Sequence, residues 1–287
     1  MPRLAYVNGR YVLHRDALVH IDDRGYQFAD GVYEVVPLID GRIVDEDAHI
    51  DRLEYSLDQL SIPMPVSRAA LRALTRELMR RNGIASGIVY MQATRGVAPR
   101  DHRFPNGVRP SLVMTTQRKS PLPQAQIEAG VAVVTMPDLR WRRCDIKATA
   151  LLGNILSKQS AVEQGAFEGW LVDDSGDVTE GTSTNAWIAT PDKRLVTRNL
   201  SNAILSGITR KRLIAVAAEK GFKLEERAFT VAEAQKAAEA FITSSTSLVL
   251  PVASIDGKPV GSGRSGPLAL ALRQAYLDFV LAAPPAL

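Results

Sequence analysis

Residues 140–154 read RWRRCDIKATALLGN, and Lys147 stands where a charged segment changes to an apolar one. Three arginines and one aspartate precede it in this segment. An ammonium group here would lie among cations and beside packing of low polarity, and both effects favour the neutral amine. A neutral lysine amine can form a Schiff base with a carbonyl compound. The alternative is a solvated lysine at a junction between a loop and a helix. The interpretation of Lys147 as a Schiff-base lysine therefore needs evidence from other segments.

A second segment, residues 178–185, reads VTEGTSTN and carries one carboxylate, Glu180, in front of a run of hydroxyl side chains. The pattern suits a buried loop, and a surface turn is the alternative. Together, CDIK-x4-LLGN and VTEGTSTN resemble the signature of the class IV (fold type IV) aminotransferases, which use pyridoxal 5′-phosphate (PLP). The resemblance implies that Lys147 forms the Schiff base and later moves the Cα proton of the substrate. It also implies that Glu180 faces the pyridine nitrogen and keeps it protonated, so that the ring withdraws electrons.

The composition argues against several other classes of protein. Apolar residues make up 46% and charged residues 23% of the 287 residues, an ordinary soluble balance. The net charge of +4 comes from scattered Lys and Arg residues, which makes a nucleic-acid-binding protein a remote alternative. The single cysteine, Cys144, is expected to be a packed, inert thiol in a reducing compartment, and four histidines without ligand spacing indicate no metal site. No apolar run reaches the ~20 residues of a membrane span and no signal peptide begins the chain, so we expect a cytoplasmic protein.

The segment before the first long strand points to one branch of the family. Residues 24–34 read RGYQFADGVYE, which we interpret as a loop that enters a strand. Side chains alternate along a strand, so Tyr33 lies on the face opposite Val32 and Glu34. Without further information, Tyr33 would be interpreted as an aromatic residue of the core. The string resembles the bacterial D-amino acid aminotransferases, and this resemblance implies that Tyr33 contacts the substrate carboxylate.

A long basic loop supplies two further candidates. Residues 95–102 read RGVAPRDH and separate two predicted strands, so they fit either an exposed basic loop or an anion-binding loop. RG-x3-R-x-H resembles the loop of the D-amino acid aminotransferases, which implies that Arg100 and His102 bind the substrate carboxylate. In that family the loop reaches into the active site of the neighbouring subunit. We therefore expect a homodimer.

Three further segments are candidates for holding the cofactor. A helix predicted to begin at Asp47 carries Arg52 off its apolar stripe, where a solvated arginine is the ordinary case. The resemblance implies instead that the Arg52 guanidinium binds the phosphate. Small residues at the start of a later helix present backbone N–H groups to an anion, although N-capping by Ser206 would also fit. The resemblance assigns the following further residues to cofactor binding: Leu205, Gly207, Ile208, Thr209 and Ser245.

By this resemblance the chain is a mixed α/β (α+β) protein of fold type IV. We expect a small N-terminal α/β domain over residues 1–118, a linker over 119–127, and a larger C-terminal domain with a barrel-like sheet over 128–287, with PLP in the cleft between the domains. The predicted reaction is a ping-pong transfer of an amino group from a D-amino acid, such as D-alanine, to a 2-oxo acid, such as 2-oxoglutarate or pyruvate. A branched-chain L-amino acid aminotransferase, an (R)-amine transaminase and an aminodeoxychorismate lyase remain as alternatives within the fold type.

Overall fold

The computed structural model describes residues 3–286, and the chain divides into two compact units. Unit 1 comprises Met1–Ser120, Ile146–Ala150 and Val280–Leu287, and unit 2 comprises Pro121–Asp145 and Leu151–Phe279. The short return of Ile146–Ala150 to unit 1 was not indicated by the sequence. It assigns Lys147 to unit 1, whereas Glu180 belongs to unit 2. Every helix within the described residues falls short of the length and apolarity that a membrane span requires.

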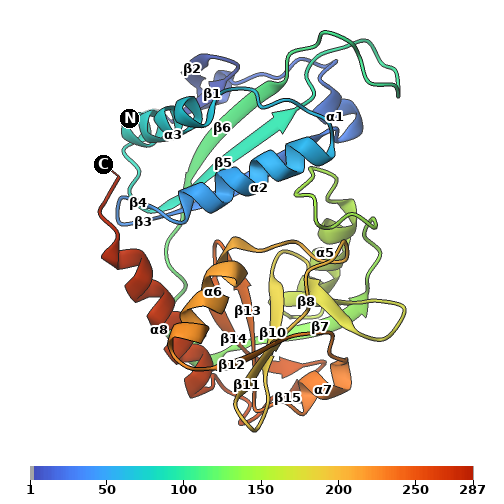
Figure 1. Ribbon diagram of the computed structural model, residues 1–287, viewed down its shortest axis with the longest axis vertical. Helices are drawn as coiled ribbons and strands as arrows, with labels where there is room; N and C mark the ends of the chain where they lie inside the picture. The colour runs from blue at the N-terminus through green and yellow to red at the C-terminus, as the bar shows by residue number, and fades with distance from the viewer. Residues whose placement is uncertain (1–2, 287) are drawn as a thin grey trace. The chain divides into compact units, whose positions relative to one another are not determined.

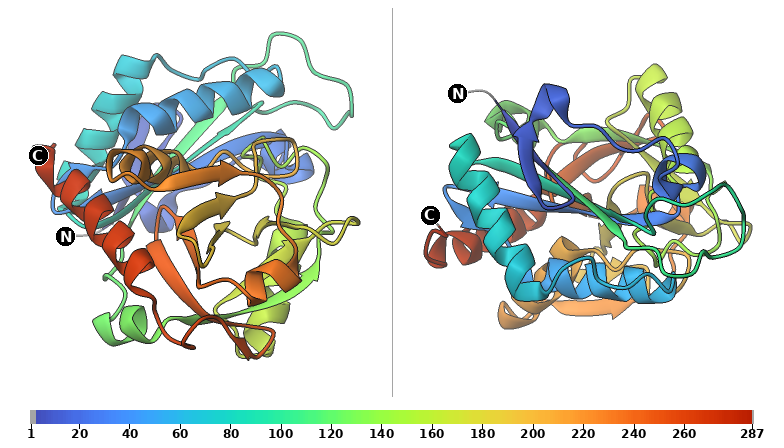
Figure 2. Two further views of the ribbon diagram at one scale, coloured as in Figure 1. Left: turned by 60° about the horizontal axis from the view of Figure 1, so that its bottom comes forward. Right: turned by 90° about the horizontal axis from the view of Figure 1, so that it is seen from above.

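Unit 1 is built on an antiparallel sheet of six strands (Figure 1), in the order β2-β1-β6-β5-β3-β4. Its first hairpin turns at Asn8 and Gly9, the dipeptide most typical of a two-residue turn, and both residues adopt the positive φ angles that this turn requires, 45° and 94°. Figure 2 shows that the two long helices of this unit lie on one face of the sheet. The elements are β1 (Leu4–Val7), β2 (Arg10–Leu13), a 3-10 turn (His14–Asp16), α1 (Arg24–Phe28), β3 (Gly31–Ile39), β4 (Arg42–Ile43), α2 (Glu46–Gln59), α3 (Arg68–Asn82), β5 (Gly87–Thr94) and β6 (Ser111–Arg118).

The apolar sides of the two long helices pack on this sheet. Leu57 of α2 and Leu78 of α3 belong to one buried cluster that also contains apolar side chains of β3, β5 and β6. Burying such a side chain stabilises the fold by about 1.5–3 kcal/mol. Ile146 and Ala148 belong to the same cluster, so apolar side chains on both sides of Lys147 hold its backbone in unit 1.

Two helix starts differ from the sequence prediction. Helix α2 begins at Glu46, with Asp45 as an N-cap in the left-handed region, so the predicted start at Asp47 was wrong. Helix α1 lies where we expected only a loop. It forms because the side chain of Asp23 accepts a hydrogen bond from Gly25 N (2.8 Å), which caps a turn too short to show a helical period in the sequence.

Unit 2 contains a mixed sheet of nine strands, in the order β12-β11-β10-β13-β14-β7-β8-β9, with β15 paired to β14. The sheet curls (Figure 1), and β9 at one end of the order lies beside β10. The fold prediction of a mixed α/β protein with a barrel-like sheet is confirmed. The elements are α4 (Gln124–Ala129), β7 (Val131–Pro137), α5 (Leu152–Glu163), β8 (Glu168–Val172), β9 (Val178–Gly181), β10 (Asn185–Ala189), β11 (Arg194–Thr197), α6 (Ile208–Glu219), β12 (Lys223–Glu226), α7 (Val231–Gln235), β13 (Glu239–Ser244), β14 (Leu248–Ile255), β15 (Lys258–Pro259) and α8 (Pro267–Ala282), whose last residues belong to unit 1.

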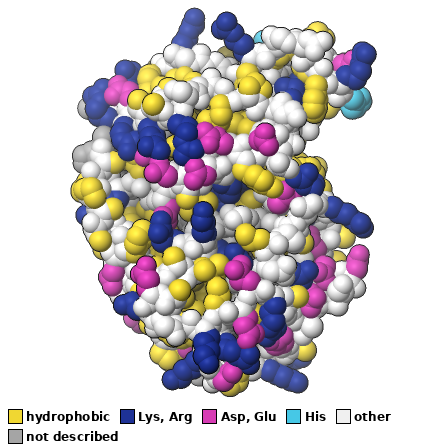
Figure 3. Space-filling view, viewed as in Figure 1, with side chains coloured by type: hydrophobic (Ala, Val, Ile, Leu, Met, Phe, Trp, Pro, Cys, Tyr) yellow, Lys and Arg dark blue, Asp and Glu magenta, His cyan; other side chains and the backbone are white. Residues whose placement is uncertain are grey.

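Charged side chains of both signs are intermixed on the face shown in Figure 3. In unit 1, three arginines of α3 form ion pairs with carboxylates of α2. The pairs are Arg68 with Asp51 and Glu54, Arg72 with Asp47, and Arg76 with Glu46. Solvent-exposed pairs of this kind contribute little to stability. They do mean that these three arginines of α3 are matched by carboxylates on the neighbouring helix.

Candidate active site

The backbone around Lys147 is fixed by hydrogen bonds within unit 1. Lys147 O accepts from Tyr33 N (3.0 Å), and Lys147 N donates to the hydroxyl of Ser56 on α2 (3.1 Å). Thr149 N donates to Gly31 O (3.0 Å), so the segment lies against the first residues of β3. The side chain of Lys147 is half-buried, and its Nζ lies 4.4 Å from the centroid of the Tyr33 ring. The structure therefore brings together two of the predicted site residues, Lys147 and Tyr33.

Two of the three arginines that precede Lys147 have carboxylate partners. Arg140 is buried against Asp138, with N–O distances of 2.9 and 2.7 Å, and also donates to Glu180. Arg143 pairs with Asp145 at 2.9 Å. Paired guanidinium groups repel an ammonium much less than isolated ones. This pairing weakens the like-charge part of the sequence argument, and the neutral Lys147 amine stays a prediction.

A buried cluster of three charged or ionisable side chains lies behind Tyr33 in unit 1. Glu34 is only 1% exposed, and both of its oxygens accept from Arg52, at 2.8 and 2.9 Å. His49 Nδ1 lies 2.7 Å from Glu34 Oε2. Burial opposes the ionisation of Glu34, but the charges and hydrogen bonds of Arg52 and His49 outweigh it and lower the pKa of Glu34 below its ordinary range. Arg52 is 8% exposed, so the ordinary case of a solvated helix arginine was wrong.

This environment lowers the pKa of His49. Burial is the largest cause that lowers the pKa of His49, and Glu34 opposes it, while the positive charges of Arg52 and Lys147 lower it further. The sequence analysis identified Arg52 but missed Glu34 and His49. The available signal was that His49 and Arg52 lie three residues apart and therefore share one face of α2.

Tyr33 also contacts a second tyrosine on the neighbouring strand β5. Its ring lies 5.8 Å from that of Tyr90, with 29° between the ring planes. Tyr90 donates from its hydroxyl to Gln92 Oε1 at 2.7 Å, and burial raises the pKa of Tyr90 to about 12. Tyr33 is half-buried while Val32 and Glu34 are buried, which confirms the predicted alternation along β3.

Arg100 and His102 lie in the loop between β5 and β6 and are exposed. The structure brings them together around Phe28 of α1. The Cζ atom of Arg100 lies 4.6 Å from the centroid of the Phe28 ring, and the His102 ring lies 5.4 Å from it. The sequence analysis did not single out Phe28.

Glu180 lies on β9 in unit 2 and is buried, as its sequence context had suggested, although it is on a strand and not in a loop. Its carboxylate accepts hydrogen bonds from Arg140, from the amide of Asn185 (2.9 Å) and from Leu205 N (3.2 Å). Burial raises the pKa of Glu180 to about 6, and Arg140 and Leu205 N act in the opposite direction. A carboxylate of this kind can change its protonation state near neutral pH. No pattern in the sequence indicated Arg140 and Asn185 as its partners.

Asn185 connects Glu180 to the segment that contains Leu205 and Gly207. Its amide donates to Leu205 O (3.0 Å) as well as to Glu180. A Cβ atom on Gly207 would lie 1.9 Å from Asn185 Oδ1, so only glycine fits at this position. Gly207 is the N-cap of α6, and no side chain caps the helix there, which makes N-capping by Ser206 wrong. The next two residues, Ile208 and Thr209, are buried at the first turn of α6.

Ser245 lies in the turn between β13 and β14 and is half-buried. The turn is organised by its neighbour Ser244, whose hydroxyl accepts from Thr246 N (3.3 Å) and Ser247 N (3.0 Å). Leu248 closes the turn with a φ of 59°, in the left-handed region. The turn is therefore held by its own side chains. Arg273 of α8 also donates to the carbonyl oxygens of Ser247 (2.7 Å) and Val249 (2.6 Å).

The residues present fit PLP, on three observations. Glu180 is a buried carboxylate that could pair with a protonated ring nitrogen. Gly207, the N-cap of the 12-residue helix α6, adds no side chain at the helix N-terminus, where phosphate is favoured. Lys147 provides a half-buried amine beside an aromatic ring. The roles of the individual residues stay predictions.

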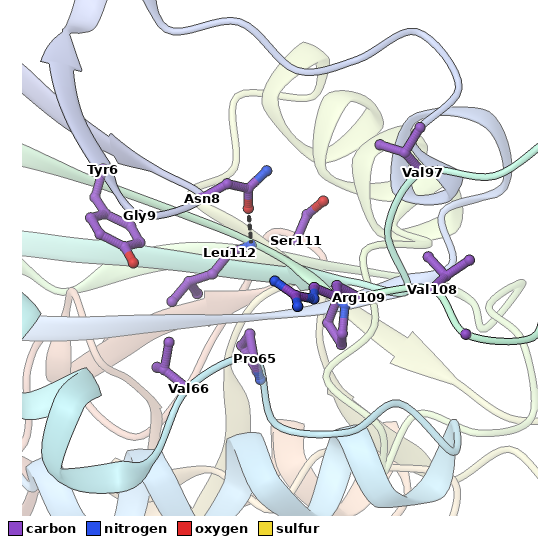
Figure 4. A pocket seen from close by; sticks show the side chains of 12 residues that line it. Tyr6, Asn8, Gly9, Pro65, Val66, Val97, Val108, Arg109, Ser111 and Leu112 are labelled. Atoms are coloured by element: carbon purple, nitrogen blue, oxygen red, sulfur yellow. Dashed lines mark hydrogen bonds between the residues drawn. The ribbon is translucent and has the colours of Figure 1, made fainter.

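A pocket of about 620 Å³ in unit 1 lies elsewhere (Figure 4). Its lining includes Tyr6, Asn8, Pro65, Arg109 and Leu112, and none of the predicted site residues belongs to the lining. In Figure 4 the side chain of Asn8 points to Leu112, and Asn8 Oδ1 accepts from Leu112 N at 2.7 Å. We assign no role to this pocket.

The chain matches the family model of the class IV aminotransferases over residues 31–255. It is 41% identical to a D-alanine aminotransferase of Bacillus licheniformis over 276 residues, which cover 96% of each protein. It is 42% identical to a D-alanine aminotransferase of Listeria monocytogenes serotype 4b over 279 residues, again 96% of each protein. The family model and these two relatives therefore agree over residues 31–255, and the relatives extend the match to nearly the whole chain.

Solved structures agree on the fold. A branched-chain amino acid aminotransferase of Escherichia coli superposes with a TM-score of 0.92, at 24% identity, over 98% of this chain and 95% of the other. A branched-chain amino acid aminotransferase of Thermobaculum terrenum in its PLP form gives a TM-score of 0.85, at 23% identity, over 98% and 94%. The family match over residues 31–255 and the identity of about 40% to curated aminotransferases lead to one conclusion. The chain belongs to the class IV aminotransferases, which are PLP-dependent enzymes of fold type IV.

Proposed function

We propose that the protein is a D-amino acid transaminase, which transfers the amino group of a D-amino acid such as D-alanine to a 2-oxo acid such as 2-oxoglutarate or pyruvate. The observation that carries the proposal is the identity of 41–42% to D-alanine aminotransferases over 96% of the chain. The loop with Arg100 and His102 around Phe28 supports it, because these side chains can bind a carboxylate.

We propose that the residues that the family resemblance assigns to the cofactor hold one PLP molecule. Arg52 and the first-turn N–H groups of Gly207, Ile208 and Thr209, together with the hydroxyl of Ser245, would bind the phosphate. Leu205 would pack on the ring, and Glu180 would accept a hydrogen bond from the ring nitrogen. The bound cofactor supplies an electron sink and carries the amino group from one substrate to the other. Asn185 and Arg140 keep the Glu180 carboxylate in place.

Lys147 is the proposed catalytic residue. Its amine would hold the cofactor and, once the substrate's own amine has displaced it, the freed amine would take the proton from the Cα atom of the substrate. The cation–π contact with Tyr33 restricts where the amine can lie. Tyr33, Arg100 and His102 are proposed to bind the substrate carboxylate. Fixing the carboxylate and the amine leaves the Cα hydrogen of only one enantiomer directed at Lys147, which is the physical basis of the stereochemical preference.

We also propose a homodimer in the cytoplasm. Large apolar side chains are exposed on α5 and on the segment beside it, including Leu152 (76% exposed), Leu156 (70%) and Leu139 (79%). The carbonyl oxygen of Leu139 would lie 3.4 Å from a Cβ on Gly153, so this segment lies next to α5. Exposed apolar patches of this kind mark protein interfaces. Sedimentation analysis should give a dimer for the wild type and a monomer for Leu156→Glu.

The test is a half-reaction titration. Protein with bound PLP is mixed separately with D-alanine, L-alanine, L-leucine and (R)-1-phenylethylamine, and the absorbance of the bound cofactor is followed. We expect rapid conversion by D-alanine and little by the other three. Conversion by L-leucine at the rate of D-alanine would favour the branched-chain aminotransferases, whose fold the chain shares. Conversion by the amine alone would mean that the carboxylate-binding residues are wrongly assigned.

A further inference from the structure

One aromatic side chain, Phe28 at the end of α1, touches both exposed residues that are proposed to bind the substrate carboxylate. The ring centroid of Phe28 lies 4.6 Å from Cζ of Arg100 and 5.4 Å from the centroid of the His102 ring, which is tilted by 48°. The Cζ atom of Arg24 lies 4.8 Å from the same centroid. A guanidinium within about 6 Å of a ring centroid is attracted to the ring. Phe28 is therefore a common support for these three side chains.

Arg24 fixes the backbone of the same loop. Its side chain is 4% exposed and donates from Nη1 to the carbonyl oxygen of Asp101, the residue between Arg100 and His102. Its Nε donates to Asp30 Oδ2 at 2.7 Å, so the charge of Arg24 is balanced. The backbone N of Arg24 donates to Gly96 O at 2.9 Å, near the start of the loop. Helix α1 thus holds the loop through a side chain and through the main chain.

The first residue of the loop is fixed to the same carboxylate. Arg95 donates from Nε and Nη2 to Asp30, at 2.8 and 3.0 Å, and its Cζ lies 3.6 Å from the centroid of the Phe104 ring, further along the loop. Residues 95–110 contain bends and one isolated bridge but no helix or strand. A loop of this length without regular structure would leave an exposed arginine free to adopt many rotamers. These contacts reduce that freedom.

We infer that Phe28 and Arg24 are positioning residues that preorganise Arg100 and His102 as a receptor for the carboxylate of the substrate. Ordering an arginine during binding is entropically costly, and a guanidinium that already rests on a ring loses less freedom. Phe28 acts through Arg100 and His102 and does not touch the substrate itself. The inference rests on the proposed function, since it requires that Arg100 and His102 bind a carboxylate. It predicts an effect on substrates with a carboxylate and none on amines that lack one.

The test compares variants in two half-reactions, one with D-alanine and one with (R)-1-phenylethylamine, which has no carboxylate. Phe28→Leu should raise KM and lower kcat/KM for D-alanine by about tenfold, on the scale of two weak cation–π contacts, and should leave the slow rate with the amine unchanged. Phe28→Tyr keeps the ring and should restore the wild-type KM. Tyr26→Leu is the matched control, because Tyr26 lies on the same helix and is 78% exposed. Binding of propionate, which keeps the carboxylate and lacks the amino group, should weaken in Phe28→Leu to the same extent as KM rises.

Other outcomes separate the inference from the proposed function. If Arg100→Ala leaves KM for D-alanine unchanged, the assignment of the carboxylate site is wrong. If Arg100→Ala raises KM and Phe28→Leu does not, only the positioning role is overturned. Equal losses with D-alanine and with the amine in Phe28→Leu would indicate a general structural effect and would also overturn it. Should Phe28→Leu fail to fold, Arg24→Gln removes the contact with the Asp101 carbonyl and must give the same selective loss.

Discussion

Replacing Arg140 by methionine tests whether the environment of Glu180 depends on one buried guanidinium. The side chain of Arg140 is 5% exposed and contacts Asp138, Glu180 and the carbonyl oxygen of Ala203 (3.1 Å). Methionine has a similar length and carries no charge. The variant Arg140→Met therefore leaves two carboxylates close together in a region of low polarity, without their common cation.

The magnitude follows from the burial of these groups. Removing one partner of a buried ion pair typically costs 3–5 kcal/mol, because the remaining charge is uncompensated, and we expect a loss of about 3–5 kcal/mol at pH 8. In the wild type, burial raises the pKa of Glu180 from 4.5 to about 6. One pH unit of pKa change corresponds to about 1.4 kcal/mol, so the ionised Glu180 already destabilises the fold by about 2 kcal/mol.

The sign of the pH dependence follows from this pKa. A carboxylate with a raised pKa in the fold binds its proton more tightly there than in the unfolded chain, so its contribution to stability falls as the pH rises from 4.5 to about 6. Arg140 lowers the pKa of Glu180, so Arg140→Met should raise it further and extend the decline to higher pH. The destabilisation should therefore be larger at pH 8 than at pH 5.5.

The assay is urea denaturation of the protein without cofactor at both pH values. Arg143→Met is the matched control, since Arg143 pairs with Asp145 and is 37% exposed, and it should cost about 1 kcal/mol or less. Adding Glu180→Gln to Arg140→Met should recover part of the stability at pH 8. A loss below about 1 kcal/mol at pH 8, or one that is equal at both pH values, would refute the reasoning.

Three further predictions follow from single contacts. Glu34→Gln should destabilise the protein by about 3 kcal/mol at pH 7. Because the pKa of Glu34 is lowered in the fold, the wild type should begin to lose this contribution as the pH falls below 4.5 and should lose more of it at each lower pH, which urea denaturation at pH 7, pH 4 and pH 3 measures. Gly207→Ala places a Cβ 1.9 Å from Asn185 Oδ1 and should cost about 1–3 kcal/mol and release PLP on dialysis, whereas Gly153→Ala, with its nearest neighbour at 3.3 Å, should retain the cofactor. Burial raises the pKa of Cys144 to about 11, so a thiol reagent followed by absorbance at pH 7.5 should react only after the protein is unfolded.

The sequence predicts well those features that depend on residues close together in the chain. The hairpin at Asn8-Gly9 and the N-cap of α3 at Ser67 are features of this kind, because each depends on backbone geometry within a few residues. The buried state of Glu180 was also expected from its immediate neighbours. Resemblance to a family supplied the candidates for the site, and local physical chemistry alone supplied few of them.

The partners of the candidate residues could not be predicted, because they depend on packing between distant segments. From the sequence, Arg52 is interpreted as a solvated helix residue. Its partner, Glu34, is 18 residues away in the chain and comes into contact with it only because α2 packs on β3. Arg140 and Glu180 are separated by 40 residues and meet only through the curl of the sheet in unit 2. The sequence around a single carboxylate or guanidinium does not indicate which oppositely charged residue will be its partner in the fold.

These buried charge clusters are poor explanations of stability, and this bears on their function. A buried ion pair is typically no more stabilising than apolar residues of the same volume, and it becomes costly when one partner is lost. Unit 1 nevertheless buries Glu34 with Arg52, and unit 2 buries Arg140 with Glu180, and each pair includes or contacts residues proposed to bind PLP. Groups held at fixed positions by such pairs do not need to reorganise when a charged ligand binds. These two buried pairs therefore contribute little to stability but hold charged groups at fixed positions. A cofactor with a phosphate and a protonatable ring requires charged groups of this kind.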